Sequence, residues 1–98
     1  MNNITVSELT VNDQHLIEPI VEAAHNRIRV IINYDSESSL SGRRTIVPFS
    51  LRISNAGDVS LLAWTVLEGT RAYRLDRIRD IEPSVDPFPD DLEFEVEL

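Results

Sequence analysis

The segment from residue 61 to residue 78 limits the fold of this chain more than any other, because it has the pattern of two strands joined by a turn. Its first part, LLAWTV, places apolar side chains on both faces of a strand. A strand that is apolar on both faces is covered on both sides, which predicts a central position in a sheet. Glu68 and Gly69 supply the turn. We therefore expect a central strand followed by its hairpin partner.

The hairpin partner carries an unusual concentration of positive charge. Arg71, Arg74, Arg77 and Arg79 lie within nine positions, around Tyr73. Arginines this close repel one another unless acids, solvent or a bound anion separate them. Side-chain alternation predicts one row that contains Tyr73 and all of these arginines except Arg74. Such a row can stack a base on the ring while the guanidinium groups hold phosphates.

This hairpin resembles the C-terminal half of a WYL domain, a bacterial regulatory module with an Sm-like or SH3-like β-barrel. An Ala-Trp pair, a turn and the run R-x-Y-R-L-D-R-I carry the resemblance. The upstream elements follow the same order: a helix over residues 16–24, a strand over residues 28–34, and Arg43-Arg44 followed by Pro48. The resemblance covers residues 16–88. The triplet that names the family aligns with Val59-Ser60-Leu61, so only its leucine is retained.

The patterns and the resemblance together predict a mainly β fold of the α+β class, a five-stranded Sm-like or SH3-like barrel with an N-terminal helix and a C-terminal acidic strand. We divide the chain into an arm over residues 1–15, the barrel over residues 16–88 and a tail over residues 89–98. Asn12 or Asp13 is expected to cap the helix, and a start near Ile17 keeps Pro19 in the first turn, where its missing N–H is harmless. Pro48 predicts either an edge position or a bend in a long strand, and a small barrel requires the bend.

Charge is divided unevenly along the chain, which has a net charge of -8. Residues 27–79 contain all nine basic residues, each an arginine, and five acids, a net charge of +4. Residues 80–98 contain eight acids and no base. A basic body suits phosphate binding through counterion release, and arginine suits bidentate contacts. GC-rich coding would explain the absence of lysine equally well.

The tail alternates strictly between apolar and acidic residues. Leu92, Phe94, Val96 and Leu98 would face one side of a strand, and the glutamates between them the other. Three roles are open. The tail can pair with the barrel edge or with residues 4–11, it can lie across the arginines as a mimic of nucleic acid, or it can pair across a dimer interface.

Catalytic motifs are missing from the sequence. The chain has no cysteine, no G-x-S-x-G, no glycine-rich phosphate loop and no H-E-x-x-H. His15 and His25 lack neighbouring ligands that would make a metal site. We expect no enzyme activity, no cofactor and no metal. Because no run of about 18 apolar residues and no signal-peptide pattern occurs, we expect a cytoplasmic protein.

We therefore expect a non-enzymatic module that binds a negatively charged effector, with single-stranded nucleic acid or a nucleotide favoured. The residues expected to make the contacts are Arg71, Tyr73, Arg74, Arg77, Arg43, Arg44 and Tyr34. The family resemblance implies a bacterial homodimer in transcription regulation, or an accessory of CRISPR or other anti-phage defence. The alternative is a protein-interaction or dimerisation module that acts through the acidic C-terminal strand. In that case Asp76, Asp80 and Glu82 would pair with the arginines, and such surface pairs contribute only about 0–1 kcal/mol each.

Overall fold

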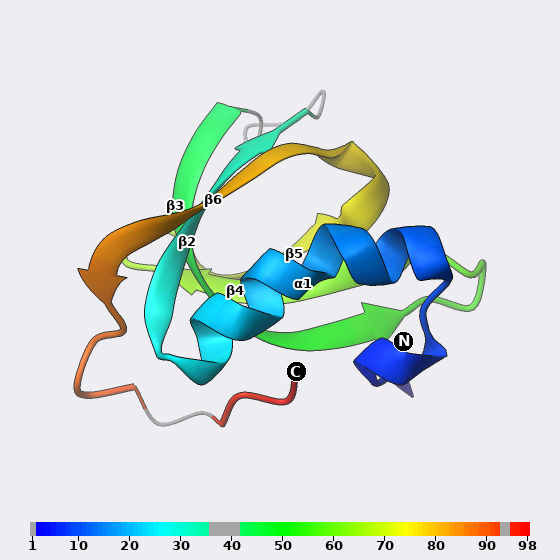
Figure 1. The fold of residues 1–98 in the computed structure, drawn as a ribbon, viewed down its shortest axis with the longest axis horizontal. Coiled ribbons are helices and arrows are strands. Elements are labelled where there is room, and N and C mark those ends of the chain that lie inside the picture. Colours follow the sequence, from blue (N-terminus) through cyan, green and yellow to red (C-terminus); the bar gives the residue numbers. More distant parts are fainter. Residues whose placement is uncertain (1, 36–41, 93–94) are drawn as a thin grey trace.

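The computed structural model describes residues 2–35, 42–92 and 95–98, which form one α-helix, six strands and two short 3-10 helices (Figure 1). Their order is β1 (Asn2–Asn3), η1 (Val6–Glu8), α1 (Val11–His25), β2 (Ile28–Tyr34), β3 (Gly42–Ile53), β4 (Val59–Thr65), β5 (Gly69–Arg74), η2 (Leu75–Arg77) and β6 (Ile78–Pro87). The prediction of a mainly β fold with one N-terminal helix is confirmed. No helix in these ranges is long and apolar enough to cross a membrane.

β3 joins the two halves of an antiparallel sheet whose strand order is β5-β4-β3-β2-β6, with β1 beside β3. The first part of β3 pairs with β2, up to Ile46 opposite Val30. From Val47, which lies opposite Trp64, β3 pairs with β4 instead. The register shifts just after Pro48, as expected where a residue without an N–H interrupts a ladder. The predicted bend at Pro48 is confirmed.

The sheet is curved but does not close into the expected five-stranded barrel. Its two ends, β5 and β6, are connected through η2, and in the described part of the chain they are not hydrogen-bonded neighbours. A sixth strand, β1, adds to the edge of β3. The fold is therefore an open six-stranded sheet with α1 packed against β2, β3 and β6 (Figure 1).

α1 begins earlier than predicted. Thr10 is its N-cap, with Oγ1 accepting a hydrogen bond from the Asp13 N–H at 3.2 Å, so neither Asn12 nor Asp13 caps the helix. Pro19 consequently lies inside the helix. Its exposed position lets water bond the carbonyl that the missing N–H leaves without a helical partner.

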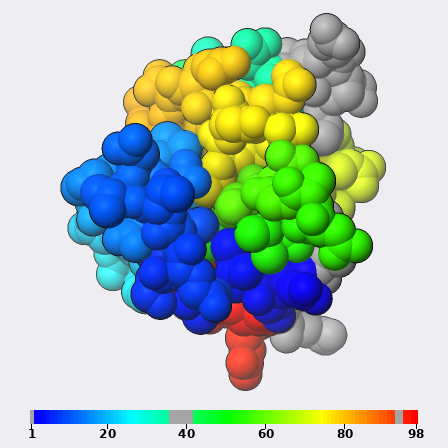
Figure 2. Space-filling view, turned by 90° about the vertical axis from the view of Figure 1, so that its right-hand side faces the viewer, coloured from blue at the N-terminus to red at the C-terminus, as the bar shows by residue number. Residues whose placement is uncertain are grey.

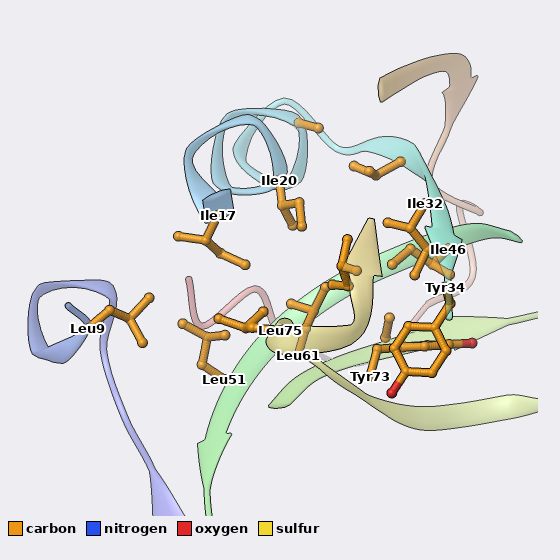
Figure 3. Packing of buried hydrophobic residues seen from close by; sticks show 14 residues of the cluster. Leu9, Ile17, Ile20, Ile32, Tyr34, Ile46, Leu51, Leu61, Tyr73 and Leu75 are labelled. Atoms are coloured by element: carbon orange, nitrogen blue, oxygen red, sulfur yellow. The ribbon is translucent and has the colours of Figure 1, made fainter. Parts of the chain in front are cut away.

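The core fills the space between α1 and the inner face of the sheet. Ile17 and Ile20 point from α1 towards the strands, where Leu61 is fully buried (Figure 3). On the side of the core remote from α1, the rings of Tyr34 and Tyr73 meet edge to face with centroids 5.1 Å apart. Such a pair adds stability beyond the area it buries.

The C-terminal segment is not the predicted acidic strand. β6 ends at Pro87, and the later residues that the structure describes form no strand. The Glu97 N–H nevertheless donates to the Phe49 carbonyl at 2.6 Å, and Ile4 donates to the Leu51 carbonyl. The two termini thus lie along one edge of β3, and Asn3 Nδ2 donates to Glu97 Oε2 at 3.2 Å. The edge-pairing interpretation is supported by these contacts.

The tail covers a second, smaller apolar cluster. Leu92, Val96 and Leu98 pack with Trp64 around Val47, Ala24 and Phe88. Glu93 and Phe94 lie outside the described residues. The ion pairs that join arginines to acids in the described ranges use Asp35, Asp58, Glu68, Asp76 and Glu82, all upstream of the tail.

Candidate anion-binding site

An arginine-lined cavity lies where β4 separates from β3. The β3–β4 ladder reaches only as far as Val47 opposite Trp64, so the β4–β5 turn faces the earlier part of β3 across a gap. This gap is a cavity of about 280 Å³. Its lining residues are Arg29, Arg43, Arg44, Thr45, Thr65, Val66, Leu67 and Glu68.

The register of the β2–β3 hairpin brings the arginines to this cavity from both faces of the sheet. Asn33 lies opposite Arg43, and Ile32 lies opposite Arg44. Because side chains alternate, Arg43 stands on the outer face with Arg29, whereas Arg44 stands on the inner face with the buried Ile46. Arg44 therefore enters the cavity from the core side.

Arg44 and Glu68 form an ion pair across the cavity, with Nη1 of the arginine donating to Oε1 of the glutamate. Their side chains are only 20% and 22% exposed. A charge that is largely removed from water needs a partner, because its desolvation is otherwise uncompensated. Arg43, in contrast, is 61% exposed in its pair with Glu82, where solvent weakens the attraction.

Tyr73 is buried next to this pair and cannot stack a base, so that expectation is wrong. Its side chain is 0% exposed, and among the described residues its hydroxyl has no hydrogen-bond partner. Burial raises the pKa of Tyr73, and the charge of Glu68 raises it further, while Arg44 and Arg71 lower it. These three charges are therefore the neighbours of an unsatisfied hydroxyl at the end of the core.

Tyr34 is a structural residue rather than an open wall of the site. It is also buried, and its hydroxyl accepts a hydrogen bond from the Arg74 N–H at 2.9 Å. This bond ties the end of β2 to the end of β5. Because the Tyr34 side chain is buried, an effector cannot reach it in this structure, and the expected contact is not available.

The predicted row of arginines is not formed, because β5 ends at Arg74 and η2 interrupts the alternation. Arg74 donates to Asp76 at 2.7 Å and to Asp58 at 3.3 Å. Figure 2 looks onto this end of the molecule, where the β3–β4 turn (green) meets η2 and the start of β6 (yellow). Arg77 and Arg79 both reach Asp35, through its carbonyl and its carboxylate respectively.

The Arg74–Asp76 pair predicts a pH dependence of stability. The guanidinium hydrogen bond lowers the pKa of Asp76. A carboxylate with a depressed pKa stabilises the fold above its unfolded-state pKa of about 3.9, and this contribution disappears as the pH falls through the folded-state pKa. Asp76→Asn should lower the free energy of unfolding at pH 7 by no more than about 1 kcal/mol, since the Asp76 side chain is 63% exposed.

Urea unfolding of wild type and Asp76→Asn at several pH values from 7 down to the acid limb checks this expectation. The difference between the two proteins should shrink below about pH 4. A difference that stays constant over the whole range would show that the charge of Asp76 is not its source.

Sequence reasoning predicted only Arg43 and Arg44 among the residues that line the cavity. The six lining residues that it missed are Arg29, Thr45, Thr65, Val66, Leu67 and Glu68. Arg29 carries a readable signal, because period-two alternation in a β2–β3 hairpin places it on the same face as Arg43. The roles of Glu68 and Thr65 depend on how the β4–β5 turn faces β3, which no local pattern encodes.

The sequence profile of the WYL domain family matches residues 15–83, more than half of the chain. This chain belongs to the WYL domain family. The solved structure of proteasome accessory factor B/C (PafBC) of Arthrobacter aurescens is similar to this WYL domain, with a TM-score of 0.68 and 18% sequence identity. The similarity covers 90% of this chain but 14% of that one, and at this identity it concerns the fold alone. No curated protein matches the chain.

Proposed function

We propose that this WYL domain is a non-enzymatic regulatory module that binds a negatively charged effector, with single-stranded nucleic acid or a nucleotide favoured. Membership of a family of regulatory modules supports the sensing role. The observation that carries the choice of effector is the cavity between β3 and the β4–β5 turn, where Arg29, Arg43 and Arg44 converge. Guanidinium groups grouped in this way suit phosphate, which they bind through two parallel hydrogen bonds.

The cavity also offers an apolar rim, which favours a nucleotide over a simple inorganic anion. Val66 is 74% exposed and Leu67 is 90% exposed at the tip of the β4–β5 turn. A base lying on these side chains would place its phosphate towards the arginines. Thr45 and Thr65 add hydroxyl groups to the lining. The combination of cations, hydroxyls and an apolar rim matches the chemistry of a nucleotide unit.

Only part of the residue set expected from the sequence lies around this cavity. Arg43 and Arg44 line it. Arg71 is the third residue of β5, on the same face as Tyr73. Arg71 is exposed and donates to the Thr70 carbonyl at 3.2 Å. Arg74 and Arg77 are engaged elsewhere, so we assign the effector contacts to Arg43, Arg44 and Arg71, together with Arg29.

The mechanism is occupancy rather than chemistry. An effector in the cavity contacts β3 and the β4–β5 turn together, and so changes how this turn is held. Regulation of transcription, an accessory role in defence, a homodimeric state and a cytoplasmic location remain predictions from the sequence. The alternative interaction module remains one as well, although Leu92, Val96 and Leu98 of the tail pack within the chain against the cluster around Val47.

Salt-dependent binding of an oligonucleotide tests the proposal. A fluorescently labelled single-stranded DNA of mixed sequence should bind, with an anisotropy change that weakens steeply as salt increases. With about three phosphate contacts, raising salt from about 30 mM to about 200 mM should increase the Kd about 50-fold, because each contact releases part of a condensed counterion.

An uncharged peptide nucleic acid of the same sequence is the control, since it presents the bases without phosphates. It should not bind measurably. Absence of DNA binding at low salt would contradict the proposed function, and binding that does not change with salt would contradict the assignment to the arginines.

A further inference from the structure

We propose that the Glu68 carboxylate occupies the position that the effector's innermost phosphate takes when the effector binds. The phosphate displaces the carboxylate from Arg44 and accepts a hydrogen bond from the Tyr73 hydroxyl. This inference rests on the proposed function and deepens it.

The first observation is the position of the Arg44–Glu68 pair. Among the ion pairs that the described residues form, it is the most buried, and it is the one that crosses the arginine-lined cavity. Glu68 thus already places a negatively charged oxygen pair at the inner end of the cavity. A carboxylate and a phosphate bind a guanidinium group in the same way, through its N–H fork.

The second observation is the buried hydroxyl of Tyr73. Buried polar atoms are nearly always hydrogen-bonded, so an unsatisfied one calls for an explanation. The neighbouring Tyr34 hydroxyl is satisfied by a backbone N–H, whereas that of Tyr73 lacks a partner within the described ranges. Figure 3 shows the two tyrosines on the side of the core remote from α1. Glu68, Arg44 and Arg71 are the charges near this hydroxyl.

A phosphate would satisfy both groups at once. The carboxylate of Glu68 is planar, and its residue is held in the β4–β5 turn, where the Glu68 backbone N–H donates to Thr65 Oγ1 at 3.1 Å. A tetrahedral phosphate is not tied to the turn and directs its oxygens over a wider range of directions. One oxygen can accept from Arg44 and another from the Tyr73 hydroxyl, and Arg71 lies on the same face of β5 as Tyr73.

The β4–β5 turn is suited to releasing Glu68. Its neighbours Val66 and Leu67 are largely exposed and so contribute little packing that would resist movement. Glu68 and the effector compete for Arg44. The apparent affinity of the effector is therefore its intrinsic affinity multiplied by the fraction of molecules in which the Arg44–Glu68 pair is open. Effector binding therefore frees Glu68 and the turn that carries it.

Arg74 is also ion-paired, but its surroundings do not allow the same exchange. Arg74 is shared by Asp58 and Asp76, so its surroundings are acidic overall, and its side chain is 41% exposed. An incoming phosphate would meet two carboxylates there and, within residues 2–35, 42–92 and 95–98, no buried unsatisfied donor. Among the described residues, the Arg44 site combines one carboxylate with several arginines, so an effector anion can compete with that carboxylate for the guanidinium group.

Glu68→Gln tests the exchange, because it removes the competing charge while keeping the size of the side chain. It should bind the labelled single-stranded DNA about tenfold more tightly than wild type at low salt. The matched control is Glu82→Gln, which removes the same charge from beside the exposed Arg43 and should change the Kd by less than about threefold. Equal effects of the two substitutions, or weaker binding by Glu68→Gln, would overturn the inference.

Tyr73→Phe provides the second arm. It should weaken binding several-fold in both the wild-type and the Glu68→Gln background, without lowering the unfolding midpoint. If wild type binds DNA in a salt-dependent way but neither substitution has its expected effect, the exchange is refuted and the proposed function stands. If neither wild type nor Glu68→Gln binds DNA, the proposed function fails together with this inference.

A measurement on the unmutated protein keeps the inference testable should Glu68→Gln not fold. The chain contains two tyrosines, so the Cζ carbon resonances of Tyr73 and Tyr34 can be followed separately by NMR. Adding the oligonucleotide should shift the Tyr73 resonance, since its hydroxyl gains a partner, and leave that of Tyr34 in place. A Tyr73 resonance that does not move at saturation would overturn the hydroxyl contact.

Discussion

Replacing Tyr73 with alanine is expected to lower the free energy of unfolding by about 3–5 kcal/mol. The ring is fully buried and packs edge to face on Tyr34, so its removal leaves a cavity that the sheet cannot easily fill. A domain of this size has a total free energy of unfolding of only about 5–15 kcal/mol, so the substitution should remove a large fraction of that stability. Urea denaturation followed by circular dichroism measures the change.

Tyr73→Phe is the control that separates the ring from its hydroxyl. Since no described residue bonds the hydroxyl, its removal should leave stability unchanged or raise it by about 1 kcal/mol. If Tyr73→Ala instead folded with wild-type stability and lost only oligonucleotide binding, the ring would be a stacking surface after all and its position in the core would be wrong.

The strands were predictable because their signals are local. β2 spans Ile28–Tyr34, as expected from its β-branched run, whereas the second strand of the predicted hairpin ends at Arg74, before η2. Pro48 marked the bend, since proline cannot continue a ladder on its N–H side. Closure of the sheet was not predictable in the same way. It depends on whether β5 and β6 meet, and η2 between them keeps these strands apart.

The depth of side chains was harder to predict than their faces. Alternation correctly places Arg71 and Tyr73 on one face of β5, but Arg71 lies near the end of the sheet and reaches solvent, whereas Tyr73 lies two residues further into the core. The start of α1 was missed because Thr10 offers the same capping chemistry as Asn12 and Asp13. Local sequence does not rank such equivalent caps.

The partners of the arginines were not predictable from sequence, because each pair depends on elements that meet only in the folded sheet. Arg44 and Glu68 come together because β4 leaves β3 after Trp64, so that the β4–β5 turn faces the start of β3. Arg74 meets Asp58 because the β3–β4 turn lies beside the end of β5. The sequence therefore indicated where arginines are concentrated along the chain, but it could not divide them between the cavity and the acidic end around Arg74.

That division predicts the largest effect on binding. Arg43→Glu combined with Arg71→Glu should weaken oligonucleotide binding at least about 100-fold at low salt, because two phosphate contacts are replaced by repulsion. Both residues are exposed, so the fold should tolerate the change. Anisotropy titration measures the affinity, and circular dichroism confirms that the double variant is folded.

The matched control is Arg52→Glu combined with Arg79→Glu, which changes the net charge of -8 by the same amount but at positions away from the cavity. Arg52 lies opposite Ser60 in the second half of β3, and Arg79 is paired with Asp35. This variant should weaken binding less than about fivefold, since only the long-range field changes. If the two double variants lose affinity equally, binding follows net charge alone, and the cavity between β3 and the β4–β5 turn is not the effector site.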